Sequence, residues 1–405
     1  MAAGAAGAGQ APAQGGPGGG GNPFQLATNL YAEKNNQGIL TNFTTSTGSQ
    51  SVNGGNVNAG QYMRRVNLIF RTSTAGTVAT AGATSDMPWN ILTNVDLVNV
   101  DGSEILYVMG GYAHYLRMKY CRPWLGDPAT WQDAAVSTAL VPQFTLSLMP
   151  EIRWSAGCLA NTDTRSQYRF DYVVDTEANF LQGGTAFTVH PVVNVQPYLD
   201  AWAQPDDRDL QGTPNQPVPN GLNLQIKQRH QIFTLNAAGS DNILQSALTG
   251  NALRCQIIVT RAGSPSLRTN AFTDPLLWQI DNRSLGKYST NPALVSGTPT
   301  SALGGDFINQ RMLEFYTSYF FTQQANGGGI ATAFVAYSRE AGVYVFPRFI
   351  KPGDLYGEGW LYTANNTKEI FESTSAAGLG ASPTAELITD EVYPVGPVDA
   401  ALTDI

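Results

Sequence analysis

Charged residues are scarce in this chain of 405 residues. Asp, Glu, Lys and Arg make up only 13% of it, against about 25% in an average globular protein. The balance is acidic, with a formal net charge of -8, and broad contact with nucleic acid needs clustered Lys and Arg. We therefore expect no direct, specific binding of nucleic acid. The 42 glycines and abundant Thr, Asn and Ser favour short strands joined by turns, with much surface covered by neighbouring subunits.

Cysteines and long apolar runs are also scarce. The chain has three cysteines, Cys121, Cys158 and Cys255, which are far apart in the sequence. An odd, widely spaced set favours reduced thiols in a protein made in a cytoplasm over disulfides or a metal site. No apolar run approaches the roughly 18 residues that cross a bilayer. The amino terminus also lacks the basic and then apolar pattern of a secretion signal.

Two stretches of the chain, about half its ordered length apart, contain the same order of parts. Leu253, Cys255, Ile257 and Val259 alternate with Arg254, Gln256, Ile258 and Thr260, a period of two that fits a strand with one buried face. A turn-rich gap and a second apolar run follow, ending at Asp281-Asn282. Residues 64–100 repeat this order and end at Asp101-Gly102, a hairpin signal. The repetition predicts two similar all-β domains in one polypeptide.

Further strand patterns fill both halves, with turn-rich spacings typical of a sandwich or jelly roll. The β-helix-β rhythm of a parallel sheet is missing. Two short helices are predicted after the acidic turns. One lies in residues 108–120, and the other is capped by Asp306 and has apolar residues at helical spacing from Ile308 to Tyr319.

Composition also divides the chain into segments. Residues 1–21 are almost wholly Ala, Gly, Gln and Pro, which predicts a mobile arm. Asn22-Pro23 then begins a short amphipathic helix, whose partner is another subunit, a membrane surface or its own domain. No basic residue follows Lys368, so we expect an acidic tether there. The predicted segments are an N-terminal arm (1–36), a first unit (37–200), a Pro-rich linker (201–221), a second unit (222–373) and an acidic C-terminal arm (374–405).

The histidines and acidic clusters do not form a recognisable chemical site. His114, His190 and His230 have no second His or Cys at ligand spacing, which favours structural roles. The acidic residues at positions 206, 207 and 209 lack the spacing of a calcium loop, so we interpret them as a solvated linker. We therefore predict no catalytic, cofactor-binding or metal-binding residues.

One other group of residues resembles a sugar site. Asp354 and Glu358 lie near Trp360, as a carboxylate pair beside an aromatic platform would. Two alternatives rest on such features. The first is a carbohydrate-binding or fibre protein with two β-sandwiches, suggested by Trp278 and Trp360. The second is a secreted glycoside hydrolase that uses Asp354 and Glu358.

Three groups of residues, in the same order along the chain, resemble the major capsid proteins of tailless, membrane-containing phages, the tectivirus group with the double jelly-roll fold. The groups are 90–101 followed by Gly111-Tyr112 and His114, then 195–200, and then 342–346 followed by Lys351-Pro352. The resemblance extends over roughly 39–363 in arrangement. It implies an all-β fold of two tandem eight-stranded jelly rolls, each with an inserted short helix, plus extended N- and C-terminal arms. The Gly-rich residues 1–21 differ from the helix-prone arm of that family.

The resemblance also implies a function. It implies a non-enzymatic virion protein without cofactors, made in the host cytoplasm, whose pseudo-hexameric homotrimers tile an icosahedral shell around an internal lipid vesicle and genome. The partners would be other copies of the chain, penton proteins, and minor capsid or membrane proteins. The N-terminal arm would contact the inner membrane.

Overall fold

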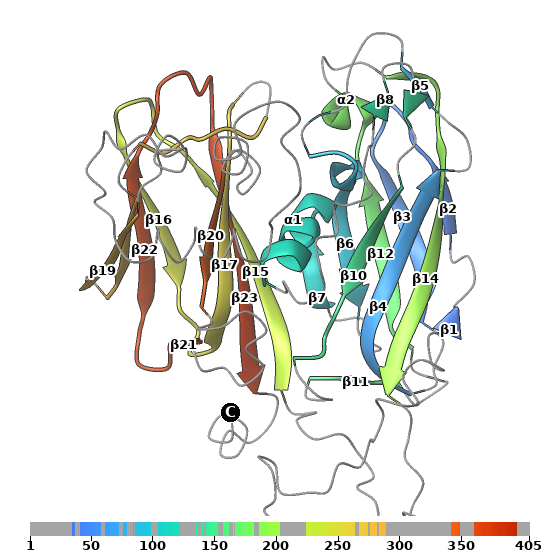
Figure 1. Cartoon of the computed structure of the whole chain (residues 1–405), viewed down its shortest axis with the longest axis horizontal. Helices are drawn as coiled ribbons and strands as arrows, with labels where there is room; N and C mark the ends of the chain where they lie inside the picture. Colours follow the sequence, from blue (N-terminus) through green and yellow to red (C-terminus); the bar gives the residue numbers. More distant parts are fainter. Residues whose placement is uncertain are drawn as a thin grey trace, which may run out of the picture.

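The computed structural model describes residues 35–36, 41–202, 224–288, 342–348 and 360–394. There are several gaps inside 41–202, of which the longest is 122–134, and further gaps at 264–266, 274–275 and 282. Two β-sandwiches lie side by side (Figure 1). We call them the first unit, residues 35–202, and the second unit, residues 224–394. Short helices of the first unit lie between them. No described helix is long and apolar enough to span a membrane.

The first unit packs two antiparallel sheets against each other. One has the order β1-β14-β4-β10, with β2 paired to β14 and β11 to β4, and the other has the order β3-β12-β6-β7. A small third sheet, β13-β5-β9-β8, lies at one end of the unit (Figure 1). The strands are β1 (Asn35–Asn36), β2 (Thr41–Thr44), β3 (Gln50–Asn56), β4 (Gln61–Thr72), β5 (Gly76–Val78), β6 (Leu92–Val98), β7 (Glu104–Met109), β8 (Ala135–Val136), β9 (Ala139–Leu140), β10 (Gln143–Leu148), β11 (Leu159–Asn161), β12 (Arg169–Val174), β13 (Phe187–Val189) and β14 (Val192–Trp202).

The second unit has the same design. Its sheets have the orders β15-β23-β17-β20, with β21 paired to β17, and β16-β22-β18-β19. The strands are β15 (Leu224–Thr234), β16 (Asp241–Ala247), β17 (Ala252–Arg261), β18 (Leu276–Ile280), β19 (Arg283–Tyr288), β20 (Val343–Pro347), β21 (Leu361–Tyr362), β22 (Lys368–Thr374) and β23 (Thr384–Pro394).

Both units follow one strand order. When the eight main described strands of a unit are counted along the chain, its two sheets have the orders 1-8-3-6 and 2-7-4-5. This is the jelly-roll arrangement. The predicted fold of two tandem jelly rolls is therefore confirmed. Asp101-Gly102 lies outside the described residues, whereas the acidic turn of the second unit follows its fourth strand. Asp281 takes a positive φ of 47° there.

The core of each unit follows from strand periodicity. In β4, Val66, Leu68 and Phe70 are fully buried, as the period of two predicts. Phe70 stacks on Phe144 of β10, with ring centroids 4.4 Å apart. In β17 every residue except the last is buried, because this strand lies between two others with a second sheet on one face and the first unit on the other.

The first predicted helix is confirmed. It consists of α1 (Gly111–Leu116) followed by η3 (Arg117–Cys121), which is a π-helical turn. A side chain at position 111 has no room, because a Cβ there would lie 2.3 Å from the carbonyl oxygen of Trp89. Two shorter helices are η2 (Trp89–Ile91) and α2 (Glu177–Phe180). The helix expected after Asp306, the N-terminal arm with its short helix, and most of the linker lie outside the described residues.

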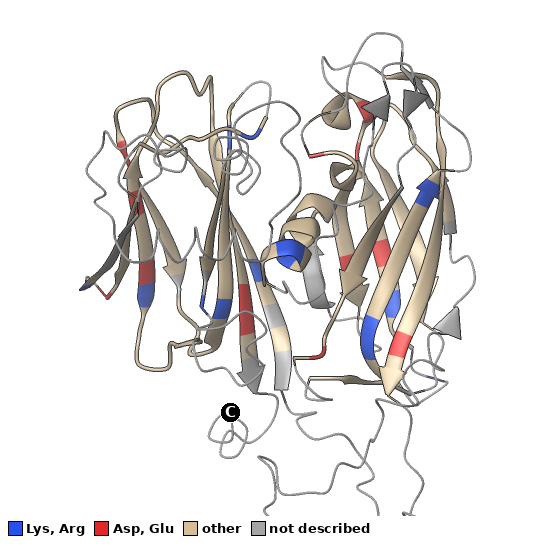
Figure 2. Cartoon of the chain, in the orientation of Figure 1, with Lys and Arg blue, Asp and Glu red and all other residues tan. Residues whose placement is uncertain are grey.

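The predicted acidic C-terminal arm is wrong for most of its length. Residue 374 still belongs to β22, and β23 lies inside the sheet between β15 and β17. As the eighth strand it closes the second jelly roll. The first unit likewise extends past the predicted boundary, because β14 continues to Trp202. The acidic residues of β23 suggested an exposed arm, but they have basic partners that come from distant segments of the chain. Figure 2 shows basic residues on the strands that neighbour β23.

Candidate functional site at the junction of the two units

The two jelly rolls meet along one face of each, which we call the junction. The first unit contributes α1, η3 and β7, and the second contributes the sheet β15-β23-β17-β20. In this arrangement η3 packs on β17 and β20, and β7 lies beside β15. The junction thus fixes how one jelly roll is placed relative to the other.

A buried ion pair lies at the centre of the junction. Arg117 of η3 contacts Asp390 of β23, with 3.2 Å between the guanidinium nitrogen and the carboxylate oxygen. Arg254 of β17 approaches the same carboxylate at 3.8 Å. The side chains of Arg117 and Asp390 are 2% and 0% exposed. A buried charge that loses its partner is costly, so this pair favours one docking arrangement of the units.

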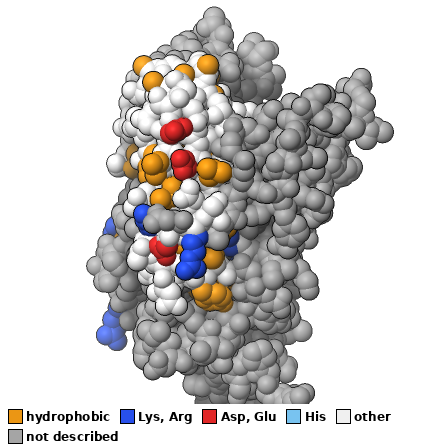
Figure 3. Space-filling view, turned by 90° about the vertical axis from the view of Figure 1, so that its left-hand side faces the viewer, with side chains coloured by type: hydrophobic (Ala, Val, Ile, Leu, Met, Phe, Trp, Pro, Cys, Tyr) orange, Lys and Arg blue, Asp and Glu red, His pale blue; other side chains and the backbone are white. Residues whose placement is uncertain are grey.

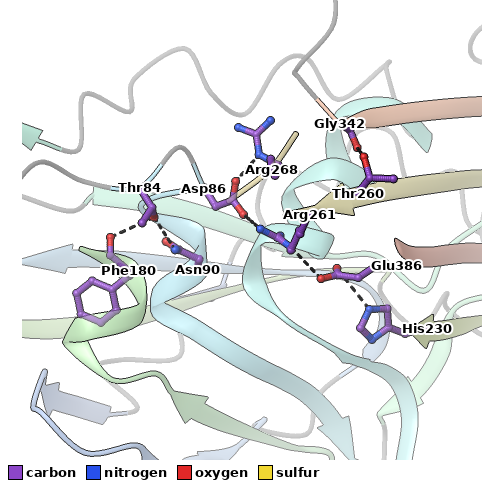
Figure 4. A network of polar contacts seen from close by, with 10 residues as sticks. All are labelled: Thr84, Asp86, Asn90, Phe180, His230, Thr260, Arg261, Arg268, Gly342 and Glu386. Carbon is purple, nitrogen blue, oxygen red and sulfur yellow. Dashed lines mark hydrogen bonds and ion pairs between the residues drawn. The ribbon is translucent and has the colours of Figure 1, made fainter. Parts of the chain in front are cut away.

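A second polar network crosses the junction near the loop before η2 (Figure 4). Asp86 of the first unit accepts hydrogen bonds from Arg261 and Arg268 of the second unit. Arg261 also donates to Glu386 of β23 at 2.9 Å, and His230 of β15 lies 3.6 Å from that carboxylate. Four segments that are far apart in the sequence are therefore joined by charges.

The charges in this network shift one another's pKa values. Burial alone would raise the pKa of Glu386, but the nearby His230 and the charge and hydrogen bond of Arg261 lower it to about 2. Burial alone would lower the pKa of Arg261, but Glu386 and Asp86 raise it. Both groups are therefore held in their charged forms.

An aromatic ring supports the same arginines. The guanidinium groups of Arg261 and Arg268 lie 5.7 and 5.0 Å from the ring centroid of Tyr112 in α1. Such cation–π contacts strengthen when they are shielded from water, and Tyr112 is buried. The helix inserted in the first jelly roll thus provides a surface against which the second unit packs.

Each histidine has a partner within the protein. The Nε2 atom of His114 in α1 is 3.3 Å from the carbonyl oxygen of Val95. The Nδ1 atom of His190 is 2.7 Å from a carboxylate oxygen of the buried Glu177. Among the residues that the structure describes, no group of three His, Cys, Asp or Glu side chains is placed to hold a metal ion. The acidic residues at positions 206, 207, 209, 354 and 358 lie outside the described part.

The two tryptophans of the carbohydrate interpretation do not form surface platforms. Trp278 is buried, donates a hydrogen bond from Nε1 to Glu369 at 2.8 Å, and has the guanidinium of Arg348 3.8 Å from its ring. Trp360 is also buried, below the guanidinium of Arg254 at 5.5 Å. Both tryptophans are therefore packed inside the protein, and the aromatic argument for sugar binding is wrong.

The residues of the junction were not found from the sequence. Its arginines and acids are isolated in the chain, so no spacing marks them. One signal was present: Asp390 and Glu391 interrupt an apolar run that includes Leu387, Ile388 and Val392. Charged residues inside a strand with buried neighbours imply partners elsewhere in the fold.

Comparison with known proteins identifies the fold. No protein-family model matches the sequence, and no curated protein matches it. Among solved structures, the crystal structure of the STIV MCP matches with a TM-score of 0.52 and 12% identity over 89% of this chain and 97% of that one. The atomic structure of Sulfolobus Turreted Icosahedral Virus matches with a TM-score of 0.54 and 11% identity over 90% and 92%. PBCV-1 VP54, fitted into a reconstruction of the virophage Sputnik, gives 0.50 and 11% over 88% and 92%.

Proposed function

We propose that this chain is a viral major capsid protein, without enzymatic activity, that acts in the virion. The observation that carries the proposal is the match of both jelly rolls together, over 89% of this chain and 97% of the STIV MCP. A single jelly roll occurs in many unrelated proteins. Two of them joined by a buried junction make a rigid block that is suited to tiling a closed surface.

The junction within one chain supports the proposal of a trimer by symmetry. Within the chain, one side of the first unit packs on the sheet β15-β23-β17-β20 of the second. Each unit has one further sheet face that the junction does not cover. In the second unit it is the outer sheet, β16-β22-β18-β19, and in the first unit it is the sheet that contains β14 and β4. If the outer sheet of one copy packs on the β14 sheet of the next, the contact is heterologous, and three copies close a ring of six jelly rolls.

The two remaining surfaces fit such a contact. Figure 3 shows apolar side chains on the outward side of the second unit. On that outer sheet, Ile243 is 61% exposed and Leu277 lies in the same cross-strand row, with Glu372 between them. Along β14, the outward side chains of Asn194, Gln196 and Tyr198 are half-buried and uncharged. The uncharged strip along β14 loses little solvation when it is covered. The charged side chains that Figure 3 shows on the outer sheet would have partners across the contact or at its rim.

The finer features of the assembly are proposals from the sequence resemblance. The homotrimers would tile an icosahedral shell around an internal lipid vesicle and the genome. Penton, minor capsid or membrane proteins would be further partners, and the N-terminal arm would contact the inner membrane. The acidic net charge of -8 favours an inner face that meets lipid or protein over direct contact with the genome. Synthesis would take place in the host cytoplasm.

Light scattering after size-exclusion chromatography tests the trimer, and electron microscopy of the purified material tests the shell. Ile243→Asp, on the outer sheet, is expected to shift the trimer to monomer and leave the monomer folded, because the side chain is exposed. Val189→Asp is the matched control, since Val189 is 50% exposed on β13 of the first unit, away from the outer sheet. A wild-type protein that stays monomeric at high concentration and forms no particles would contradict the capsid proposal.

A further inference from the structure

Two thiols from different jelly rolls meet inside the junction. Cys121 is the last residue of η3 in the first unit, and Cys255 lies in β17 of the second. Both are buried, with exposures of 2% and 0%. The turn η3 packs on β17, and the two thiols are close enough to interact, because Cys121 contributes to the raised pKa of Cys255 after the larger effect of burial.

A second observation places η3 over the same point of the sheet. Arg117 precedes Cys121 by one π-helical turn, so both side chains leave η3 on the same side. Arg117 reaches Asp390 at 3.2 Å. In the ladder between β17 and β23, Asp390 is the register partner of Cys255. One side of a single helical turn therefore contacts two adjacent residues of the sheet, Asp390 through Arg117 and Cys255 through Cys121.

We propose that Cys121 and Cys255 are a redox site, at which a disulfide joins the two jelly rolls when a disulfide oxidant such as oxidised glutathione is present. The thiolate of one cysteine attacks a sulfur of the oxidant and releases one glutathione thiolate. The second cysteine, after losing its proton, attacks the mixed disulfide and releases the other glutathione. The protein loses two protons and two electrons, and the oxidant is reduced to two thiols.

The location of the pair determines when the bond forms. Only the thiolate attacks a disulfide, and burial raises the pKa of the Cys255 thiol well above its ordinary value. The fully docked junction therefore resists oxidation. The bond forms while the two units are still docking, and docking then buries it away from reductants. The third cysteine, Cys158, is the internal control that should not form a disulfide. It lies within the first unit, where its sulfur is 4.0 Å from Glu151.

Refolding in the presence of oxidised glutathione tests the proposal. Unfolded, reduced protein is diluted into this buffer, free thiols are alkylated, and disulfide-linked peptides are identified by mass spectrometry. The expected result is one linked pair that contains Cys121 and Cys255, with Cys158 alkylated. A linked pair that contains Cys158, or no linked pair, would overturn the proposal. The wild-type map decides this by itself, so the result does not depend on the folding of a variant.

Two further measurements sharpen the test. Cys158→Ser should leave the yield of the linked pair unchanged, and Cys121→Ser should leave Cys255 as a free thiol in the folded protein. Treating the already folded protein with the same oxidant should form the bond more slowly than refolding does, by roughly tenfold or more, because the buried thiols are held in their unreactive protonated form. Equal rates would show that the buried junction does not control access. These outcomes are independent of assembly, so a failed capsid proposal and a failed disulfide proposal are distinguishable.

Discussion

Replacing Asp86 by Asn should weaken the junction strongly. Asp86 is the carboxylate of the first unit that accepts hydrogen bonds from Arg261 and Arg268 of the second, and its side chain is 5% exposed. Asn has the same shape and keeps one oxygen acceptor, so the change removes the charge with little change in packing. Arg261 keeps its contact with Glu386. Arg268 loses its ion pair with this carboxylate while only 8% of its side chain is exposed.

The magnitude follows from the burial of these groups. Removing one partner of a buried ion pair typically costs about 3 to 5 kcal/mol, because a charge is left in a poorly solvated place. The remaining Glu386 and the Asn oxygen reduce the effect, so we expect a loss of about 3 kcal/mol in the free energy of unfolding. For a domain of this size, that loss corresponds to a fall of roughly 6 to 12 °C in the thermal midpoint.

A surface ion pair in the same protein provides the control. Arg169 and Asp171 of β12 form a pair at 2.8 Å, but their side chains are 43% and 33% exposed. Exposed pairs contribute at most about 1 kcal/mol, so Asp171→Asn should change the free energy of unfolding by less than that. Urea unfolding followed by tryptophan fluorescence measures both variants. Equal effects of Asp86→Asn and Asp171→Asn would refute the argument from burial.

Three other predictions follow from the same structure. The pKa of Glu386 is about 2 when folded and 4.5 when unfolded, so its contribution to the free energy of unfolding is complete above pH 4.5 and is lost as the pH falls toward 2. Between about pH 5 and 2.5, urea unfolding should therefore show a smaller loss of stability for Glu386→Gln than for the wild type, by on the order of 2 kcal/mol. Gly111→Ala should cost about 2 kcal/mol or more by steric overlap with Trp89, whereas Gly48→Ala, with nothing closer than 4.0 Å, should cost under about 1 kcal/mol in the same assay; equal costs would contradict the packing argument. Deleting residues 384–405 should leave the protein insoluble, because it removes the strand between β15 and β17; a soluble, folded product with native circular dichroism would show that β23 is dispensable.

Local pattern was sufficient to predict much of each jelly roll. The alternation in residues 64–71 specifies a strand with one buried face. Residues 253–260 do form a strand, but the single buried face expected for it is wrong, because both of its faces are buried. Asp281 marks the turn that follows the fourth strand of the second unit. The helix at 111–121 was also visible in the change of apolar spacing. These features depend on neighbours in the chain, so a single sequence contains them.

The sequence by itself determined that the protein is built from two similar sets of strands with few charges. The tertiary structure alone decided that the acidic residues 386–391 lie inside the second unit, because their basic partners Arg117, Arg229, Arg254 and Arg261 come from distant segments. It likewise decided that Cys121 lies next to Cys255 and that Asp86 binds two arginines of the other unit. A charge is stable inside a protein only when a partner is close in space, and closeness in space is set by the packing of the two jelly rolls and not by position along the chain.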